Sequence, residues 1–294
     1  MINVSFFSYK GGSGRTSLLF NTLPYLANEL NATNREPIIV IDLDIDSKGF
    51  SYLIDRTSLF NSIQVLRGGD SIGFRSRETD IGKHPFFKGL VPIGYDIGLP
   101  REASRSVLFV SAKATTETNK YLSNSDNFDA ANVSLRDLNR MCQDLNCKAI
   151  VMDAPAGEQV ACKAALSISK KIVTVMRITR QFRLGTYDFL REKNSDFSNK
   201  EFIITPNVVP REGNRSYIIE QFMDEICKRT GECLVGNNKL NLDMLADGMN
   251  GINEVNLFKF EEKSLYKEKQ IRELLDDEKE ASEKYHKLAK EIAL

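Results

Sequence analysis

Residues 10–17 form a glycine-rich turn, Lys10-Gly11-Gly12-Ser13-Gly14-Arg15-Thr16-Ser17. An apolar run at residues 2–7 precedes it, and residues 16–30 repeat apolar side chains at helical spacing. Such a turn between a strand and a helix points backbone N–H groups and the positive end of the helix dipole at one place. Glycine suits it because these amides turn inward at backbone angles that a Cβ resists. The pattern predicts a phosphate-binding loop rather than a plain strand-to-helix connection.

The loop departs from the strict P-loop pattern G-x-x-x-x-G-K-[ST] at two positions. Tyr9 stands where the first glycine is expected, and Arg15 stands where the lysine is expected. A guanidinium is always charged and can bind phosphate through two donors, but it is larger than an ammonium and planar. Its donors therefore need not fall where those of a lysine would, and the residues support phosphate binding more strongly than hydrolysis.

Three aspartates follow two further apolar runs. Residues 38–41 lead into Asp42 and Asp44, and residues 149–152 lead into Asp153. Because the carboxyl ends of parallel strands converge on one crevice, we expect these carboxylates to face the loop. Carboxylates beside a polyphosphate repel it unless a hard cation lies between them, so the pattern predicts Mg²⁺ as well as a nucleotide.

These motifs resemble those of the ParA/MinD superfamily of deviant Walker A ATPases, SIMIBI-class P-loop NTPases whose loop reads K-G-G-x-G-K-[ST]-[ST]. Asp42-Leu43-Asp44 is similar to the family's D-x-D motif, and Asp153-Ala154-Pro155-Ala156-Gly157 is similar to its D-x-P-x-G Walker B element. Residues 205–209 resemble, more weakly, the strand that ends in an adenine-contacting Asn. Residues 252–255 are only loosely like the last strand segment, because the family's Pro is missing.

The resemblance implies a role for each matching residue. Lys10 is implied to reach the partner's phosphates across a nucleotide-sandwich homodimer, and Asp44 to orient the attacking water, which makes Lys10, Arg15 and Asp44 the catalytic set. Thr16 and Asp153 are implied to hold Mg²⁺, with Asp42 in support. The residues implied to bind ATP are Gly11, Gly12, Ser13, Gly14, Arg15, Thr16, Ser17 and Asn207.

The order of apolar runs predicts the fold class. β-rich runs at 2–7, 37–42, 106–112, 148–153, 171–177 and 201–209 are mostly separated by helical patterns. This alternation predicts an α/β fold of P-loop NTPase type, with a mostly parallel, doubly wound sheet flanked by helices. Pro24 lies inside the first helical pattern and predicts a kink or an early end. We expect a nucleotide-binding domain at 1–260 and a C-terminal charged helix at 261–294.

Two segments leave alternatives open. Residues 61–105 combine glycines with aromatic side chains and show neither helical nor strand periodicity, so they fit a lid or recognition segment and a packed insertion equally well. Residues 261–294 repeat apolar side chains at a and d spacing, and MinD-like proteins carry a membrane helix at their C-terminus. Acidic residues outnumber basic ones here, which favours docking on the core or a protein contact over a membrane surface.

Composition limits the partners and the compartment. Lys+Arg and Asp+Glu both number 40, so the formal net charge is zero and gives no support to a DNA partner, although a local patch would allow one. The sequence shows neither a signal peptide nor an apolar run long enough to span a membrane, so we expect a cytoplasmic protein. Five cysteines without a C-x-x-C pair do not indicate an iron–sulfur carrier.

Two classes of function follow. In the first, the chain is a slow ATPase whose ATP-bound homodimer recruits or positions a protein partner. In the second, Arg15 has impaired hydrolysis and the chain is a nucleotide-binding scaffold subunit of a larger assembly. A third class, an amidotransferase-type synthetase, needs a substrate pocket that the sequence does not announce. The cargo is not indicated, because a fold and a nucleotide site do not specify partners.

Overall fold

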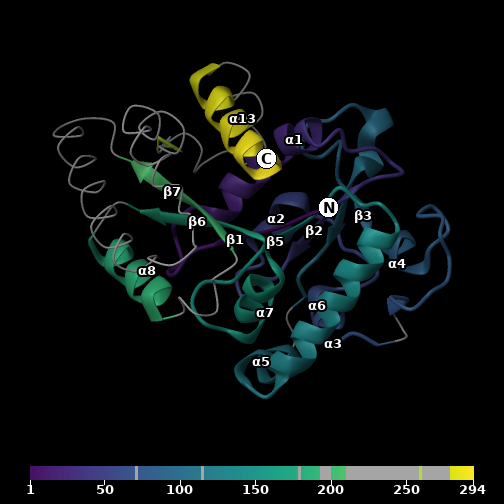
Figure 1. The fold of residues 1–294 in the computed structure, drawn as a ribbon, viewed down its shortest axis with the longest axis horizontal. Coiled ribbons are helices and arrows are strands. Elements are labelled where there is room, and N and C mark those ends of the chain that lie inside the picture. Colours follow the sequence, from purple (N-terminus) through teal and green to yellow (C-terminus); the bar gives the residue numbers. More distant parts are fainter. Residues whose placement is uncertain (70–71, 114–115, 178–179, 193–199, 210–257, 260–278) are drawn as a thin grey trace.

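A computed structural model describes residues 1–69, 72–113, 116–177, 180–192, 200–209, 258–259 and 279–294. Within these residues an eight-stranded sheet has the order β3-β4-β2-β5-β1-β6-β7-β8 (Figure 1). The strands are β1 Ile2–Phe7, β2 Ile38–Asp42, β3 Val91–Pro92, β4 Val107–Val110, β5 Ala149–Asp153, β6 Lys171–Arg177, β7 Glu201–Val209 and β8 Phe258–Lys259. Only β3 runs antiparallel to its neighbour among the strands described. The predicted α/β fold with a mostly parallel sheet is confirmed.

Helices cover both faces of this sheet (Figure 1). One face carries α1 Arg15–Glu29, α2 Gly49–Ile54 and α13 Lys279–Ala293. The other carries α3 Ser62–Arg67, α4 Pro85–Lys88, α5 Thr116–Ser123, α6 Asn127–Asp144, α7 Val160–Ile168 and α8 Arg180–Glu192. Side chains alternate along each strand, so Ile39 and Ile41 of β2 pack in the second layer while Ile38 and Val40 pack in the first. The strands are buried on both faces, which explains their continuous apolar runs.

Strand order brings the loop and the aspartates together. β1 lies between β5 and β6, and β5 lies between β1 and β2. In register, Asp153 of β5 is paired with Asp42 of β2 on one side and with Phe6 of β1 on the other. Because β1 runs directly into the glycine-rich turn, the turn and both aspartates lie at the same edge of the sheet.

The structure changes two expectations about local structure. Pro24 does not end the first helix, because α1 continues to Glu29. A proline removes only one backbone N–H bond, and burial of the apolar face through Leu23 and Leu26 outweighs that loss. Residues 61–105 are not without regular structure: they contain α3, α4, β3 and a 3₁₀ helix at Arg101–Ser106, and Phe86 and Phe87 are fully buried. The described part of this segment packs into the core on both faces of the sheet, with Ile63 and Phe86 on one face and Ile93 and Leu99 on the other.

The C-terminal helix α13 packs on α1 (Figure 1). Leu288, Ala289 and Ile292 are buried in the same hydrophobic cluster as the apolar side chains of α1. The C-terminal helix was expected to dock on the core, and within the described residues 279–293 it does so, against α1. Residues 260–278 and the weak motif at 252–255 lie outside the described residues. Among the described helices, none is long and apolar enough to cross a membrane.

Candidate nucleotide site

The glycine-rich turn presents unpaired backbone donors. Gly12 and Gly14 have φ angles of 78° and 79°, in the left-handed region that glycine adopts without a Cβ penalty. α1 starts at Arg15, with Gly14 as its N-cap. Outside the helices, no backbone hydrogen bond between described residues is donated by the amides of residues 11–14, and the first amides of α1 have no acceptor within the helix. The turn therefore offers N–H groups at a helix N-terminus, the arrangement that binds anions such as phosphate.

Two side chains hold the carbonyl groups of this turn. Arg177 Nε donates to Gly12 O at 2.7 Å, and Asn207 Nδ2 donates to Ser13 O at 2.8 Å. In a trans peptide the C=O and the following N–H point to opposite sides, so these bonds direct the next amides away from Arg177 and Asn207. The resemblance implied that Asn207 contacts adenine; here its amide binds the loop. Arg177 was not among the site residues expected from the sequence, although a cation at the carboxyl end of a strand beside β1 indicates such a role.

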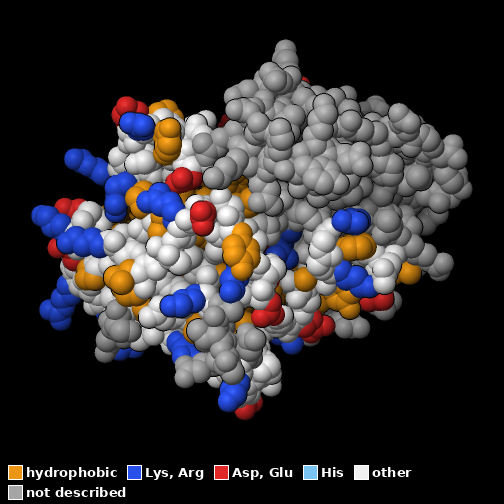
Figure 2. All heavy atoms as spheres, turned by 180° about the vertical axis from the view of Figure 1, so that it is seen from behind, with side chains coloured by type: hydrophobic (Ala, Val, Ile, Leu, Met, Phe, Trp, Pro, Cys, Tyr) orange, Lys and Arg blue, Asp and Glu red, His pale blue; other side chains and the backbone are white. Residues whose placement is uncertain are grey.

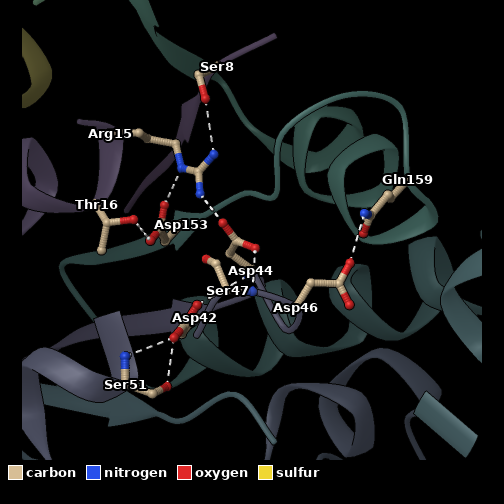
Figure 3. Close-up of polar contacts among 10 residues, drawn as sticks. All are labelled: Ser8, Arg15, Thr16, Asp42, Asp44, Asp46, Ser47, Ser51, Asp153 and Gln159. Carbon is tan, nitrogen blue, oxygen red and sulfur yellow. Dashed lines mark hydrogen bonds and ion pairs between the residues drawn. The ribbon is translucent and has the colours of Figure 1, made fainter. Parts of the chain in front are cut away.

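The Arg15 side chain lies among the carboxylates. Its Nε donates to Asp153 Oδ1 at 2.5 Å, its Nη2 donates to Asp44 Oδ2 at 2.5 Å, and its Nη1 donates to Ser8 Oγ at 3.1 Å. Figure 3 shows the guanidinium between these three groups. Thr16 Oγ1 donates to Asp153 Oδ2 at 2.7 Å, so both oxygens of Asp153 accept a bond. The loop and the aspartates lie together as the sequence predicts, but the Arg15 side chain, which was expected to bind the phosphates, binds the carboxylates instead.

Burial and charge act in opposite directions on these groups. Burial lowers the pKa of the Arg15 guanidinium, but the charges of Asp153 and Asp44 more than offset this, so its pKa is raised. For Asp153, burial raises the pKa of the carboxyl group, and the positive charge of Arg15 offsets only part of this increase. Burial first, and then the charge of Asp153, raise the pKa of Asp42 to about 7. The cluster therefore contains one guanidinium beside several carboxylates. Ionising all of these carboxylates together costs free energy, because they are buried and repel one another.

Asp42 and Asp44 are held by the backbone that follows β2. Asp42 Oδ2 accepts from the amide of Ser51 at 2.9 Å and from its hydroxyl at 2.6 Å, and Asp42 Oδ1 accepts from the Asp44 amide at 3.1 Å. Asp44 Oδ1 accepts from the Ser47 amide at 3.3 Å. Next to them, Gln159 Nε2 donates to Asp46 Oδ2 at 3.1 Å (Figure 3). Ser51, which donates both of these bonds to Asp42 Oδ2, was not among the site residues expected from the sequence.

The two ends of the loop differ from its centre. Lys10 is half-buried, and it makes no hydrogen bond or ion pair to any described residue. Gly11, Gly12 and Ser17 are exposed, whereas Ser13 is buried. The exposed edge of the turn is thus its first half, where a ligand or a second chain can approach.

The carboxylates do not fit a bound Mg²⁺ in this arrangement. Their oxygen ligands suit Mg²⁺ chemically, but the guanidinium of Arg15 lies between Asp153 and Asp44 and donates to both carboxylates. Among the described residues, no group of three or more His, Cys, Asp or Glu side chains is placed to hold a metal ion. The implied ligands Thr16, Asp42 and Asp153 lie close together without forming an open cation site.

Comparison with known proteins gives a likeness in structure alone. No family model matches the chain, and no curated protein matches it. The MinD cell division protein of Aquifex aeolicus is similar with a TM-score of 0.63 and 16% identity, over 99% of this chain and 97% of that one. The chain has the ParA/MinD fold.

Two further structures support the ParA/MinD fold. A ParA family ATPase from Chlorobium tepidum TLS has a TM-score of 0.60 and 13% identity over 98% of both chains. The septum site-determining protein MinD from Pyrococcus horikoshii OT3, complexed with Mg-ADP, has a TM-score of 0.58 and 14% identity over 99% of this chain and 96% of that one. The resemblance indicated by the loop and the aspartates is therefore confirmed for the fold.

Proposed function

We propose that the chain is an ATP-binding protein that acts as a nucleotide-dependent dimerisation switch, hydrolyses ATP slowly and recruits or positions a protein partner. The observation that carries the proposal is the turn at residues 11–14, whose amides have no described backbone acceptor and whose carbonyls are held on the other side by Arg177 and Asn207. A rigid turn of unpaired donors at a helix N-terminus suits a polyphosphate. The ParA/MinD fold, which proteins complexed with Mg-ADP share, supports the same choice of ligand.

Lys10 supports the dimerisation part of the proposal. It precedes the exposed half of the turn and has no described partner within its own chain. A lysine side chain is long and flexible, so it can reach a phosphate held by a second copy of the chain. This is the role that the sequence resemblance implies, and it makes the ATP-bound state a homodimer.

The distribution of charged and apolar side chains on the surface indicates the kind of partner. Figure 2 shows Lys and Arg side chains at several separate places on one face, with acidic and apolar side chains among them. A mixed surface of this kind, on a chain whose formal net charge is zero, suits a protein partner better than a nucleic acid. We therefore propose a protein partner and assign no DNA or membrane contact.

Calorimetry with ATP tests the binding. We expect a Kd in the micromolar range, about 8 kcal/mol. Gly14→Ala should abolish binding, because Gly14 has a φ of 79° and an added Cβ would overlap the Asn207 side chain. Lys83→Ala is the control, because Lys83 is 71% exposed and lies outside the turn. Folded wild-type protein that takes up no ATP, or two alanine variants that bind equally, would contradict a nucleotide site in this turn.

A second candidate function is a nucleotide-binding scaffold that does not hydrolyse ATP. It is favoured by one observation: Arg15 Nη2 donates a hydrogen bond to the carboxylate of Asp44, the residue implied to orient the attacking water. Single-turnover cleavage of ATP separates the two candidates, since a slow ATPase cleaves bound ATP measurably and a scaffold does not. For a slow ATPase, Arg15→Lys should change ATP affinity by less than about tenfold and increase the cleavage rate, because a compact ammonium leaves Asp44 more accessible.

A further inference from the structure

The Arg15 guanidinium is an integral part of the carboxylate cluster. Its side chain is 6% exposed, and each of its three nitrogens donates to a different acceptor, in Asp153, Asp44 and Ser8. Asp153 is fully buried and Asp44 is 14% exposed, so water contributes little to their solvation. A buried carboxylate needs a counter-charge with well-directed hydrogen bonds, and Arg15 supplies both.

A divalent cation would have to replace this guanidinium. A cation bound by Asp153 and Asp44 would lie where the guanidinium of Arg15 now pairs with both carboxylates. To enter, it would break two ion pairs of 2.5 Å and displace a permanently charged side chain from its acceptors. The ordinary P-loop lysine leaves this place open because it reaches toward the phosphates.

We propose that Arg15 provides the positive charge that a divalent cation provides in an ordinary P-loop site, so that this chain binds nucleotide phosphates at the loop amides without a protein-bound metal ion. Asp153 and Asp44 then serve to position Arg15 rather than to ligate a cation, and Thr16 holds Asp153. The nucleotide part rests on the proposed function. The exclusion of the cation does not, because it follows from the contacts of Arg15 alone.

Binding of Mn²⁺ to the nucleotide-free full chain tests the cation part. Electron paramagnetic resonance of free Mn²⁺ should show no stoichiometric, micromolar uptake by the wild type. Arg15→Gln should create such uptake, because it removes the guanidinium and leaves the carboxylates without a counter-charge. Arg56→Gln, which removes a half-exposed arginine paired with Asp96 at 3.0 Å, should behave as the wild type. Stoichiometric uptake by the wild type, or none by a folded Arg15→Gln chain, would overturn the proposal.

Nucleotide titrations in two buffers test the other part. The wild type should bind ATP with affinities that agree within about threefold in excess Mg²⁺ and in EDTA, and Arg15→Gln should lose at least about tenfold in EDTA. A loss of that size in the wild type would overturn the proposal. Absence of ATP binding in both buffers would remove the proposed function, and the Mn²⁺ result would still decide the role of Arg15. If Arg15→Gln does not fold, the two wild-type measurements remain decisive.

Discussion

At the scale of single residues, the candidate site is a problem of charge compensation. Asp42 and Asp153 are paired in register and fully buried, and the guanidinium of Arg15 contacts Asp153 and not Asp42. Asp42 relies instead on neutral donors from Ser51 and on the Asp44 amide. Neutral donors stabilise a carboxylate less than a cation does, which is consistent with a pKa of about 7 for Asp42.

The raised pKa of Asp42 predicts a pH dependence of stability. The folded chain binds a proton at Asp42 up to about pH 7, whereas an unfolded aspartate releases it near its ordinary pKa. The free energy of unfolding should therefore fall as the pH rises from about 4 to about 7, by a few kcal/mol at this site. Asp42→Asn should flatten this part of the profile, measured by urea unfolding at several pH values. Asp46→Asn, at an exposed position, should keep the wild-type profile; equal slopes in all three proteins would contradict the assignment.

His84 gives a second prediction at this scale. The side chain is fully buried against Phe87, with ring centroids 5.3 Å apart, and neither ring nitrogen has a described hydrogen-bond partner. Burial lowers the pKa of His84, so an unfolded chain takes up a proton that the folded chain does not. His84→Leu should raise the free energy of unfolding by about 1–3 kcal/mol, and the gain should grow as the pH falls through 6.5 because the wild type alone loses stability there.

The other histidine is the control for this measurement. His286 Nε2 lies 2.5 Å from Glu29 Oε1, and its ring stacks on Tyr25 with centroids 5.8 Å apart. His286→Leu removes a partnered group and should give no gain in stability. Denaturant unfolding of both variants at pH 5 and pH 8 makes the comparison, and a His84→Leu chain less stable than the wild type at both pH values would show that the ring is needed for packing.

At the scale of elements, the C-terminal helix is held by a small apolar face with polar contacts around it. Leu288, Ala289 and Ile292 are fully buried, Tyr285 Oη accepts from Asn21 Nδ2 at 3.4 Å, and Lys171 Nζ donates to Glu291 O at 2.9 Å. These contacts join α13 to α1 and to β6. Because α1 begins in the phosphate-binding turn, α13 supports the helix on which the candidate site is built.

Truncation of one side chain measures the docking of α13. Leu288→Ala should lower the free energy of unfolding by about 2–5 kcal/mol, because Leu288 is fully buried and its neighbours fill the resulting cavity only in part. Lys290→Ala, on the exposed side of the same helix, should change it by less than about 0.5 kcal/mol. Urea unfolding at neutral pH gives both values. Equal effects of the two substitutions would mean that α13 does not contribute to the folded core in solution.

At the scale of the whole molecule, the proposed switch predicts an ATP-dependent change of oligomeric state. ATP should shift the chain from monomer to dimer, and Lys10→Ala should prevent the shift by removing a loop cation that makes no ion pair with any described residue. Asp44→Ala should trap the dimer by removing the residue implied to position water. Light scattering after gel filtration measures the mass.

Lys83→Ala is a suitable control, because Lys83 is 71% exposed and lies outside the phosphate-binding turn. It should dimerise with ATP as the wild type does. A chain that stays monomeric with ATP, or a dimer that forms equally well without it, would contradict the sandwich arrangement and leave the nucleotide site itself to the calorimetric test.

Local sequence patterns were enough to predict most of the fold and the composition of the site. Continuous apolar runs ending in Asp42 and Asp153 indicate buried parallel strands, and parallel strands bring their carboxyl ends together whatever the intervening loops do. Gly12 and Gly14 likewise indicate the loop, because left-handed backbone angles leave few alternatives to glycine. These features depend on residues close in sequence, so they can be read without the folded chain.

Other features were decided by contacts between distant residues. Arg15 binds Asp44 and Asp153, which are 29 and 138 positions away, and nothing local determines which acceptor a long, flexible side chain chooses. The same holds for Asn207, whose amide binds a carbonyl 194 positions away. The short strand β3 and the helices of residues 61–105 were not predicted. Their sequences show no helical or strand periodicity, and these elements form because their side chains are buried against the sheet. Side-chain direction and packing partners belong to the tertiary structure, because strand order sets which distant residues become neighbours.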